Sequence, residues 1–293
     1  MKIGYPCINR SIGCSSNKKF RLANFTEEKF NETVKNNLSC LDKIIDYNFE
    51  NDMLFLRISS ETIPFASHDI CNLDWKKIFK KELENIGIKL RKQKFRVSMH
   101  PGQFTLLNSP NEKIVEKSLA ELEYHADFLN ALGLDNTAKI QIHVGGVYGD
   151  KNSAIKRFIN TFGITSNKIK SRLAIENDDY HYTVKDCLKI NIDTKIPIIL
   201  DNLHLECLND GESLIEAYDM IKDTWSEEDG IPMLDYSSQQ KDARIGKHTE
   251  HLDSDHFKKF IDVMHNQEFD LMFEIKDKEK SVLEAHKIMR FIS

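Results

Sequence analysis

The chain has 293 residues, 40% of them hydrophobic and 30% charged, a composition typical of a globular protein. No apolar run is long enough to cross a membrane, and the N-terminal MKIGYPCINRS lacks the apolar centre of a signal peptide, so we expect a cytoplasmic protein. The net charge of −5 argues only weakly against nucleic-acid binding, because three divalent cations would add six charges and change it to +1.

Eight short β-rich runs alternate along the chain with segments of helical length. The runs are residues 2–6, 53–60, 95–101, 139–145, 172–177, 196–203, 231–236 and 269–276. This alternation predicts an α/β fold, a (β/α)8 TIM barrel that takes residues 1–293 as a single domain. A doubly wound sheet is the competing interpretation. Continuous apolar runs such as IPIIL and FDLMF favour the barrel, because barrel strands are buried on both faces.

The helical segments show an apolar stripe at helix period. In 111–132 the stripe follows Ser109, Pro110 and Glu112, which we interpret as an N-cap, a first helical residue and the end of a capping box. Four more segments share this pattern and begin near Thr, Asp or Ser. They are residues 27–48, 75–92, 254–266 and 278–291.

The cysteines show no C-x-x-C spacing. We expect free thiols in a reducing cytoplasm, with a set of disulfides as the less favoured alternative. The six are Cys7, Cys14, Cys40, Cys71, Cys187 and Cys207.

Six of the β-rich runs end in a side chain that can bind a metal ion. These residues are His100, His143, Glu176, Asp201, Asp235 and Glu274. In a parallel barrel all six side chains would meet at the carboxyl rim of the strands, where barrel enzymes build their active sites. A single buried histidine or acid is more often structural, but four buried carboxylates together need compensating cations. The pattern therefore predicts a metal centre at this rim.

Three more histidines lie near the predicted rim. His204 follows Asp201 by three residues, His248 lies after the seventh run, and His68, after the second, has an equal claim to a surface role. The remaining histidines lack strand-end placement, and we assign them to helix surfaces or loops. They are His125, His181, His251, His256, His265 and His286.

The chemistry of the predicted ligands limits the metals and the reactions. Nitrogen and oxygen ligands without thiolate admit Mn²⁺, Zn²⁺ or Fe²⁺. A carboxylate such as Glu176 can bridge two ions, an arrangement suited to phosphodiester hydrolysis, and we expect Glu176 and Glu274 to position the attacking water. A metal-dependent sugar isomerase or epimerase on the same barrel is the competing function.

Several motifs resemble the ultraviolet damage endonuclease family. They are GYPCIN (4–9), RLANFTEE (21–28), IPFASH (63–68), SMHPGQF (98–104), HVGGVYGDK (143–151), IEND (175–178), LDNLH (200–204) and FEIKDKE (273–279). The resemblance runs from about residue 2 to residue 280. It implies a metal-dependent barrel similar to apurinic-site endonucleases. The implied activity nicks double-stranded DNA immediately 5′ of UV photoproducts and leaves a 3′-hydroxyl and a 5′-phosphate. Whether abasic sites are also cut stays open.

The resemblance also implies roles for individual residues. It implies metal binding by seven residues, with His68 close to them, and we expect Mn²⁺, with Zn²⁺ or Fe²⁺ as alternatives. The seven residues are His100, His143, Glu176, Asp201, His204, His248 and Glu274. It further implies that Tyr5, Gln103 and Phe104 probe the lesion.

Three positions depart from the family pattern. Phe104 stands where tyrosine is usual, Asp235 where a histidine ligand is usual, and Met233 where a modified lysine is usual. We expect Asp235 still to bind a metal. A thioether cannot replace the lysine's hard oxygen donor, so the third metal site is in doubt. The sequence therefore leaves open whether each chain binds two or three ions. A lesion-binding protein without catalysis is a further alternative.

Basic residues follow several of the strand ends. Arg244, Lys247 and Lys276 are the expected phosphate contacts of the site, although solvated surface charges are the simpler interpretation of each cluster alone. Other basic residues in these clusters are Lys18, Lys19, Arg21, Lys151, Lys156, Arg157 and Lys278. The expected partner is UV-damaged DNA, bound by a monomer with no obligate protein partner.

Overall fold

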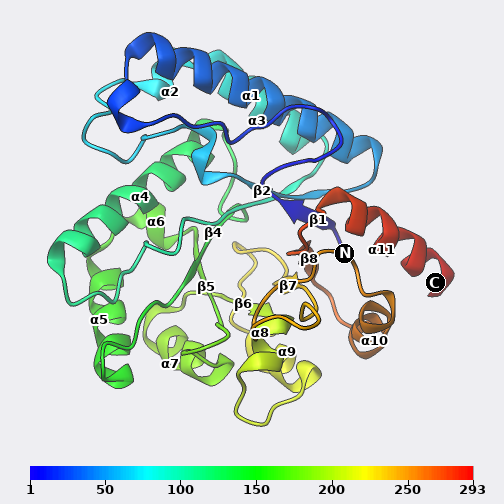
Figure 1. Cartoon of the computed structure of the whole chain (residues 1–293). Helices are drawn as coiled ribbons and strands as arrows, with labels where there is room; N and C mark the ends of the chain where they lie inside the picture. Colours follow the sequence, from blue (N-terminus) through cyan, green and yellow to red (C-terminus); the bar gives the residue numbers. More distant parts are fainter. Residues whose placement is uncertain (293) are drawn as a thin grey trace.

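The computed structural model describes residues 1–292, and Figure 1 shows helices arranged around a central ring of strands. The strands close into a barrel in the order β1-β2-β3-β4-β5-β6-β7-β8, and all eight neighbouring pairs are parallel. Their bounds are β1 Ile3–Pro6, β2 Phe55–Ile58, β3 Arg96–Met99, β4 Lys139–His143, β5 Leu173–Glu176, β6 Ile198–Asp201, β7 Met233–Tyr236 and β8 Asp270–Phe273. The predicted (β/α)8 barrel is confirmed, and each strand lies within its predicted run.

Helices cover the outside of the barrel. The main ones are α1 Glu27–Glu50, α3 Lys80–Lys92, α4 Glu112–Ala131, α5 Lys151–Ile164, α7 Val184–Thr194, α9 Leu214–Lys222, α10 Ser254–Met264 and α11 Glu279–Ile292. Shorter turns are η1 Leu22–Asn24, η2 Ser60–Thr62, α2 Trp75–Ile78, α6 Asn167–Lys170 and α8 Asn202–Cys207. In residues 1–292, no helix combines the length and the apolar character needed to cross a membrane.

Two helix predictions need correction. The predicted helix over 75–92 is divided into α2 and α3 at Phe79. Helix α4 begins at Glu112, and its N-cap is Asn111, whose side chain accepts a hydrogen bond from the Lys113 N–H. Ser109 instead accepts the Asn111 N–H, 3.1 Å away, so it forms the turn before the helix rather than the predicted capping box.

The prediction that all six cysteines are free thiols is wrong for one pair. Cys14, in the loop after β1, is bonded to Cys40 on α1, across a sequence separation of 26 residues. The side chain of Asn37, also on α1, holds the same loop through hydrogen bonds to the backbone N–H and carbonyl of Lys18. The long loop after β1 is therefore fixed to the first helix.

The register of the strands places ligand side chains next to one another. His143 on β4 is paired with Glu176 on β5, and Asp201 on β6 is paired with Asp235 on β7. Because parallel strands present their carboxyl ends on one side of a barrel, these pairs lie at the same rim. The core beneath them is one cluster of buried hydrophobic residues between the strands and the surrounding helices.

Candidate functional site

Glu176 is the centre of the site. It ends β5, is almost completely buried, and its Oε1 lies 2.9 Å from Nε2 of His100 and 2.9 Å from Nε2 of His143. The three residues form one group whose ligand atoms all lie within 4.8 Å of one another. The two imidazoles come from the ends of β3 and β4, as the sequence predicts.

A second group shares the same glutamate. Ligand atoms of Glu176, Asp201 and His204 also lie within 4.8 Å of one another. Asp201 caps α8 by accepting the His204 N–H at 2.8 Å, which explains why these residues are three apart. Nδ1 of His204 is 3.0 Å from the carbonyl oxygen of Asn177, so this contact orients the ring. Oδ2 of Asp201 is buried and has no hydrogen-bond partner.

Asp235 and Glu274 both contact a buried arginine. Arg57 on β2 donates to both oxygens of Asp235 and to Glu274. His248 lies 3.7 Å from Glu274 through its Nε2 atom. The structure therefore brings His248 and the two acids to the predicted rim, but it pairs the acids with an internal cation.

Burial and neighbouring charges shift the pKa values in opposite directions. Burial would lower the pKa of His143, but Glu176 outweighs it and raises the pKa to about 9. His204 behaves in the same way, because Asp201, Glu176 and Glu274 raise its pKa to about 9. Burial raises the pKa of Asp201. His204 and His248 oppose this rise, and Glu274 and Glu176 add to it. The cluster thus holds more buried negative charge than its own cations neutralise.

These residues fit divalent metal ions. Two groups share one carboxylate, their ligands are imidazole and carboxylate, and Asp201 has a buried oxygen without a partner. His100 and His143 would hold one ion with Glu176, and Asp201 and His204 would hold a second with the same glutamate. A shared carboxylate is the usual way to keep two ions close together.

Two residues implied by the resemblance, Tyr5 and His68, do not belong to either of the ligand groups found in residues 1–292. Tyr5 is fully buried, and its hydroxyl donates to Asn48 and accepts from Asn9, so it does not reach the surface of the rim. His68 is exposed, with its Nδ1 accepting the Ile70 N–H, and it belongs to neither ligand group among the described residues. In this structure Tyr5 is therefore not exposed to a bound lesion, and His68 is not part of either described ligand group.

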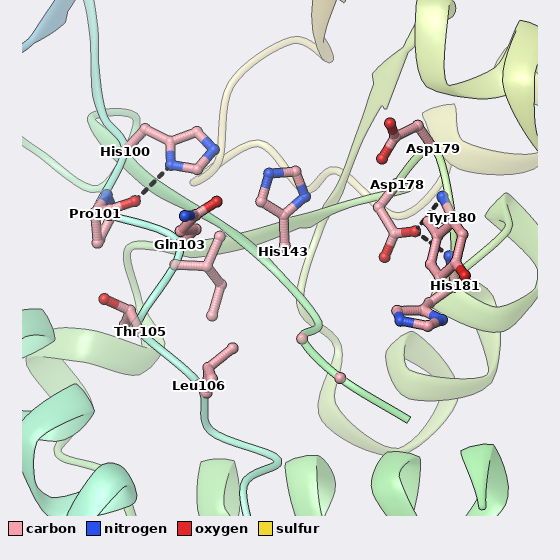
Figure 2. Close-up of a pocket in the computed structure, with 14 residues that line it drawn as sticks. His100, Pro101, Gln103, Thr105, Leu106, His143, Asp178, Asp179, Tyr180 and His181 are labelled. Atoms are coloured by element: carbon pink, nitrogen blue, oxygen red, sulfur yellow. Dashed lines mark hydrogen bonds between the residues drawn. The ribbon is translucent and has the colours of Figure 1, made fainter. Parts of the chain in front are cut away.

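A cavity of about 310 Å³ lies beside the first ligand group (Figure 2). His100, His143 and Gln103 line one side, and the loop of Asp178, Asp179, Tyr180 and His181 lies across from them. Phe104, next to Gln103, is 79% exposed and lines an adjacent cavity of about 410 Å³ together with His68. Gln103 and Phe104 therefore separate two cavities at the mouth of the barrel.

Hydrogen bonds to one side chain hold the loop across the cavity in its turn. Asp178 Oδ1 accepts the backbone N–H groups of Tyr180, His181 and Tyr182. Tyr180 is 77% exposed, and its ring lies 4.5 Å from that of His181. A fixed loop thus presents an exposed aromatic side chain beside the metal centre, which sequence analysis did not identify.

The predicted basic residues divide into two kinds. Arg244 is exposed and Lys247 is half-buried on the loop after β7. Lys276 contacts Glu250 at 2.7 Å, Lys19 contacts Glu61 at 3.2 Å, and Lys151 contacts Asp186 at 2.6 Å. The paired lysines have part of their charge neutralised within the protein.

His125 needs a correction, because the sequence assigned it to a helix surface or loop. It is fully buried, with Nδ1 2.7 Å from the Glu121 carbonyl oxygen and Nε2 2.8 Å from Ser60 Oγ. It therefore links α4 to the loop after β2. The other five histidines of that set lie on helices or loops.

Sequence analysis also missed Gln141 and Arg57. Gln141 lies two residues before His143, so both side chains face the same side of β4. Its amide donates to Glu176 and Asp235 and accepts from Arg57 at 2.7 Å. A polar residue spaced by two from a predicted ligand was the available signal for Gln141, and an arginine inside the apolar run FLRI was the signal for Arg57.

Fold and site together define a (β/α)8-barrel protein with a histidine–carboxylate cluster at its carboxyl rim that could hold metal ions. A family model described as UV-endonuclease UvdE matches residues 1–292. The UV DNA damage endonuclease of Clostridium perfringens (strain 13 / Type A) is 39% identical over 295 residues, covering 100% of this chain and 72% of the relative. That of Bacillus mycoides (strain KBAB4) is 33% identical over 94% of this chain and 87% of the relative. The chain belongs to the UV damage endonuclease family.

Solved structures agree with the assignment. The crystal structure of SacUVDE has a TM-score of 0.96 and 41% identity, covering 100% of this chain and 99% of that one. Endonuclease IV from Thermus thermophilus has a TM-score of 0.60 at 12% identity over 86% of this chain and 94% of that one. D-psicose 3-epimerase from Clostridium cellulolyticum has a TM-score of 0.55 at 12% identity, covering 85% of this chain and 91% of that one. The last two likenesses show the barrel fold alone.

Proposed function

We propose that this chain is a metal-dependent endonuclease that cuts UV-damaged double-stranded DNA immediately 5′ of the photoproduct, leaving a 3′-hydroxyl and a 5′-phosphate. The observation that carries the proposal is Glu176, which is shared by two groups of metal-ligand side chains at the barrel rim. Membership of the UV damage endonuclease family supplies the substrate class. We place this activity in the cytoplasm, at the nucleoid, and it requires only a monomer.

We assign different roles in the reaction to Glu176 and to the pair of Glu274 and His248. Divalent ions, with Mn²⁺ as the proposed metal, would lower the pKa of water and stabilise the negative charge on the departing 3′-oxygen. Glu176 would hold the two halves together. Glu274, at the end of β8, would orient the attacking water with His248, which lies 3.7 Å from it. A side-chain nucleophile is not part of this mechanism.

Recognition of the lesion is assigned to the ridge between the two cavities. A photodimer pairs and stacks poorly, so less free energy is needed to rotate it out of the helix. Gln103 and Phe104 provide an amide and an exposed aromatic face to fill the gap that it leaves. The cavity beside His100 and His143 would then receive displaced bases close to the metal centre.

Phosphate contacts are assigned to the basic residues at the rim. Arg244 and Lys247 follow β7, and Lys276 follows β8. Such contacts give affinity without selecting the lesion. We expect Arg244 to contribute more than Lys276, because the charge of Lys276 is already paired with Glu250.

The test is incubation of the purified protein with a duplex that carries one cyclobutane pyrimidine dimer, with and without Mn²⁺, beside the same duplex undamaged. The proposal expects one nick on the damaged strand only, which a chelator abolishes. Intact damaged strands across Mn²⁺, Zn²⁺ and Fe²⁺ would refute it. Turnover of a ketose by the same preparation would favour the isomerase or epimerase instead, and lesion binding without nicking would favour a non-catalytic role.

A further inference from the structure

Arg57 is a buried charge at the base of the metal centre. It lies on β2, its side chain is 2% exposed, and its guanidinium points into the barrel toward Asp235, which is fully buried. Nη2 lies 2.7 Å from Oδ1 and 2.9 Å from Oδ2 of Asp235, and Nη1 contacts Glu274. Burial would lower the pKa of Arg57, but Asp235 and Glu274 raise it above the usual value. The guanidinium is therefore a permanent cation of the site.

Asp235 and Asp201 occupy equivalent positions on neighbouring strands but have different surroundings. They are paired in register between β6 and β7, and both are fully buried. Oδ2 of Asp201 has no hydrogen-bond partner and lies 3.7 Å from Nδ1 of His204, and Asp201 belongs to a group of ligand residues. Asp235 belongs to neither group among the described residues. Both of its oxygens accept from Arg57, and Oδ2 also accepts from Gln141.

Hydrogen bonding leaves Asp235 little capacity for a metal ion. A carboxylate has about four lone-pair sites, and Arg57 and Gln141 use three of those of Asp235. A divalent ion at Asp235 would also be repelled by the guanidinium bonded to the same carboxylate. Met233, two residues earlier on the same face of β7 and fully buried, offers only a thioether, a poor donor for a hard cation.

Charge counting gives the same result. Metal-bound imidazoles are neutral, so they do not enter the count. With all four carboxylates ionised, Glu176, Asp201, Asp235 and Glu274 supply four negative charges and Arg57 neutralises one, leaving −3 for the metal ions to balance. Two divalent ions would change −3 to +1, a sign that suits an anionic phosphate substrate. A third would change it to +3, concentrated in a buried site at a large electrostatic cost.

We propose that Arg57 is an internal cation that sets the capacity of this centre at two divalent ions, with Asp235 serving as its counter-ion rather than as a metal ligand. This inference rests on the proposed function, because it assigns the two ions to the groups that share Glu176. It replaces the expectation that Asp235 binds a metal. Arg57 is in this account a positioning residue, which holds Asp235 and Glu274 in place.

The first test compares Asp235→Asn with Asp201→Asn, its matched control at the same register. Each variant and the wild type would be dialysed against Mn²⁺, and bound manganese per folded chain would be measured by elemental analysis, with folding checked by circular dichroism. We expect two ions in the wild type and two in Asp235→Asn, with the apparent Kd changed less than threefold. Asp201→Asn should bind fewer than two ions.

The second test changes the cation itself. Arg57→Lys keeps the positive charge and should bind two ions. Arg57→Met removes the charge and should bind three ions. The double variant Arg57→Met/Asp235→Asn should bind two ions again. Three ions in the wild type, fewer than two in folded Asp235→Asn, or only two in folded Arg57→Met would each overturn the inference. The number of ions bound by the wild type tests the inference even if none of the variants folds. A wild type that binds no ion would refute the proposed function as well as this inference, whereas a wild type that binds three ions would refute only this inference.

Discussion

At the scale of single residues, the account depends on one carboxylate shared between two ligand groups. Both Nε2 contacts of Glu176 are 2.9 Å, to imidazoles from two different strands. His143 and His100 lower its pKa well below the usual value despite burial, so the side chain is ionised and can bind cations. A neutral residue of the same shape would remove this property while keeping the packing.

Glu176→Gln should therefore reduce the nicking rate by about 10³-fold or more, because several kcal/mol of transition-state stabilisation depends on the bridged ions. Bound Mn²⁺ per chain should fall as well. The measurements are single-turnover cleavage of the dimer-containing duplex and elemental analysis. Glu123→Gln, on the outer helix α4, is the control. Near wild-type cleavage by folded Glu176→Gln would show that Glu176 is not a metal ligand.

Gln103→Ala should reduce the ratio of affinities for damaged and intact duplex by about tenfold, close to 1.4 kcal/mol. Groups that enter the helix select the lesion, whereas phosphate contacts supply general affinity. Competition binding with both duplexes measures the ratio. Gln267→Ala, at the opposite end of the barrel just before β8, should leave it unchanged. An equal loss of affinity for both duplexes would assign Gln103 to the DNA backbone.

At the scale of elements, the sequence predicts the ligand side chains at the strand ends, but not the side chains inside the barrel that contact them. The apolar runs indicate where strands stop, and barrel geometry then places His100, His143, Glu176 and Asp201 at one rim. The acidic partners of Arg57 lie 178 and 217 residues away in the sequence, so only closure of the barrel shows them. The α4 cap failed for a local reason, since Ser109 and Asn111 are both good caps and the sequence does not rank them.

The loop after β1 gives an element-scale prediction. A disulfide that closes a loop of this length stabilises a protein by about 3 kcal/mol. The variant Cys14→Ser/Cys40→Ser should therefore have a free energy of unfolding lower by about 3 kcal/mol, and it should unfold at a lower denaturant concentration. Cys71→Ser is the matched control. Chemical denaturation under non-reducing conditions measures it. Equal stability of the double variant and the control would show that the bond contributes nothing to holding the loop on α1.

At the scale of the whole molecule, the histidine–carboxylate cluster at the rim is expected to couple stability to pH. In metal-free protein His143 and His204 have pKa values of about 9, above the ordinary 6.5, because buried carboxylates favour their charged forms. A raised folded-state pKa gives stability that is complete below pH 6.5 and is lost as the pH rises through 9. Bound metal requires neutral imidazoles, so it should remove this dependence.

The free energy of unfolding of the chelated protein should thus decline between pH 6.5 and 9, and Mn²⁺ affinity should rise over the same range. Denaturation curves at several pH values with a chelator, and metal titrations without it, measure the two trends. The double variant His143→Asn/His204→Asn should lose most of the decline. An unchanged slope in this variant would assign the pH dependence to other groups.

The central claim is that this barrel cuts DNA at one phosphodiester beside a UV lesion. The most direct measurement maps the product of a duplex with a single cyclobutane dimer, labelled at either end, after incubation with Mn²⁺. The account predicts a single cut immediately 5′ of the dimer, with a 3′-hydroxyl that a polymerase extends and a 5′-phosphate that a phosphatase removes. Cleavage at another position, equal cleavage of undamaged duplex, or no cleavage would contradict it.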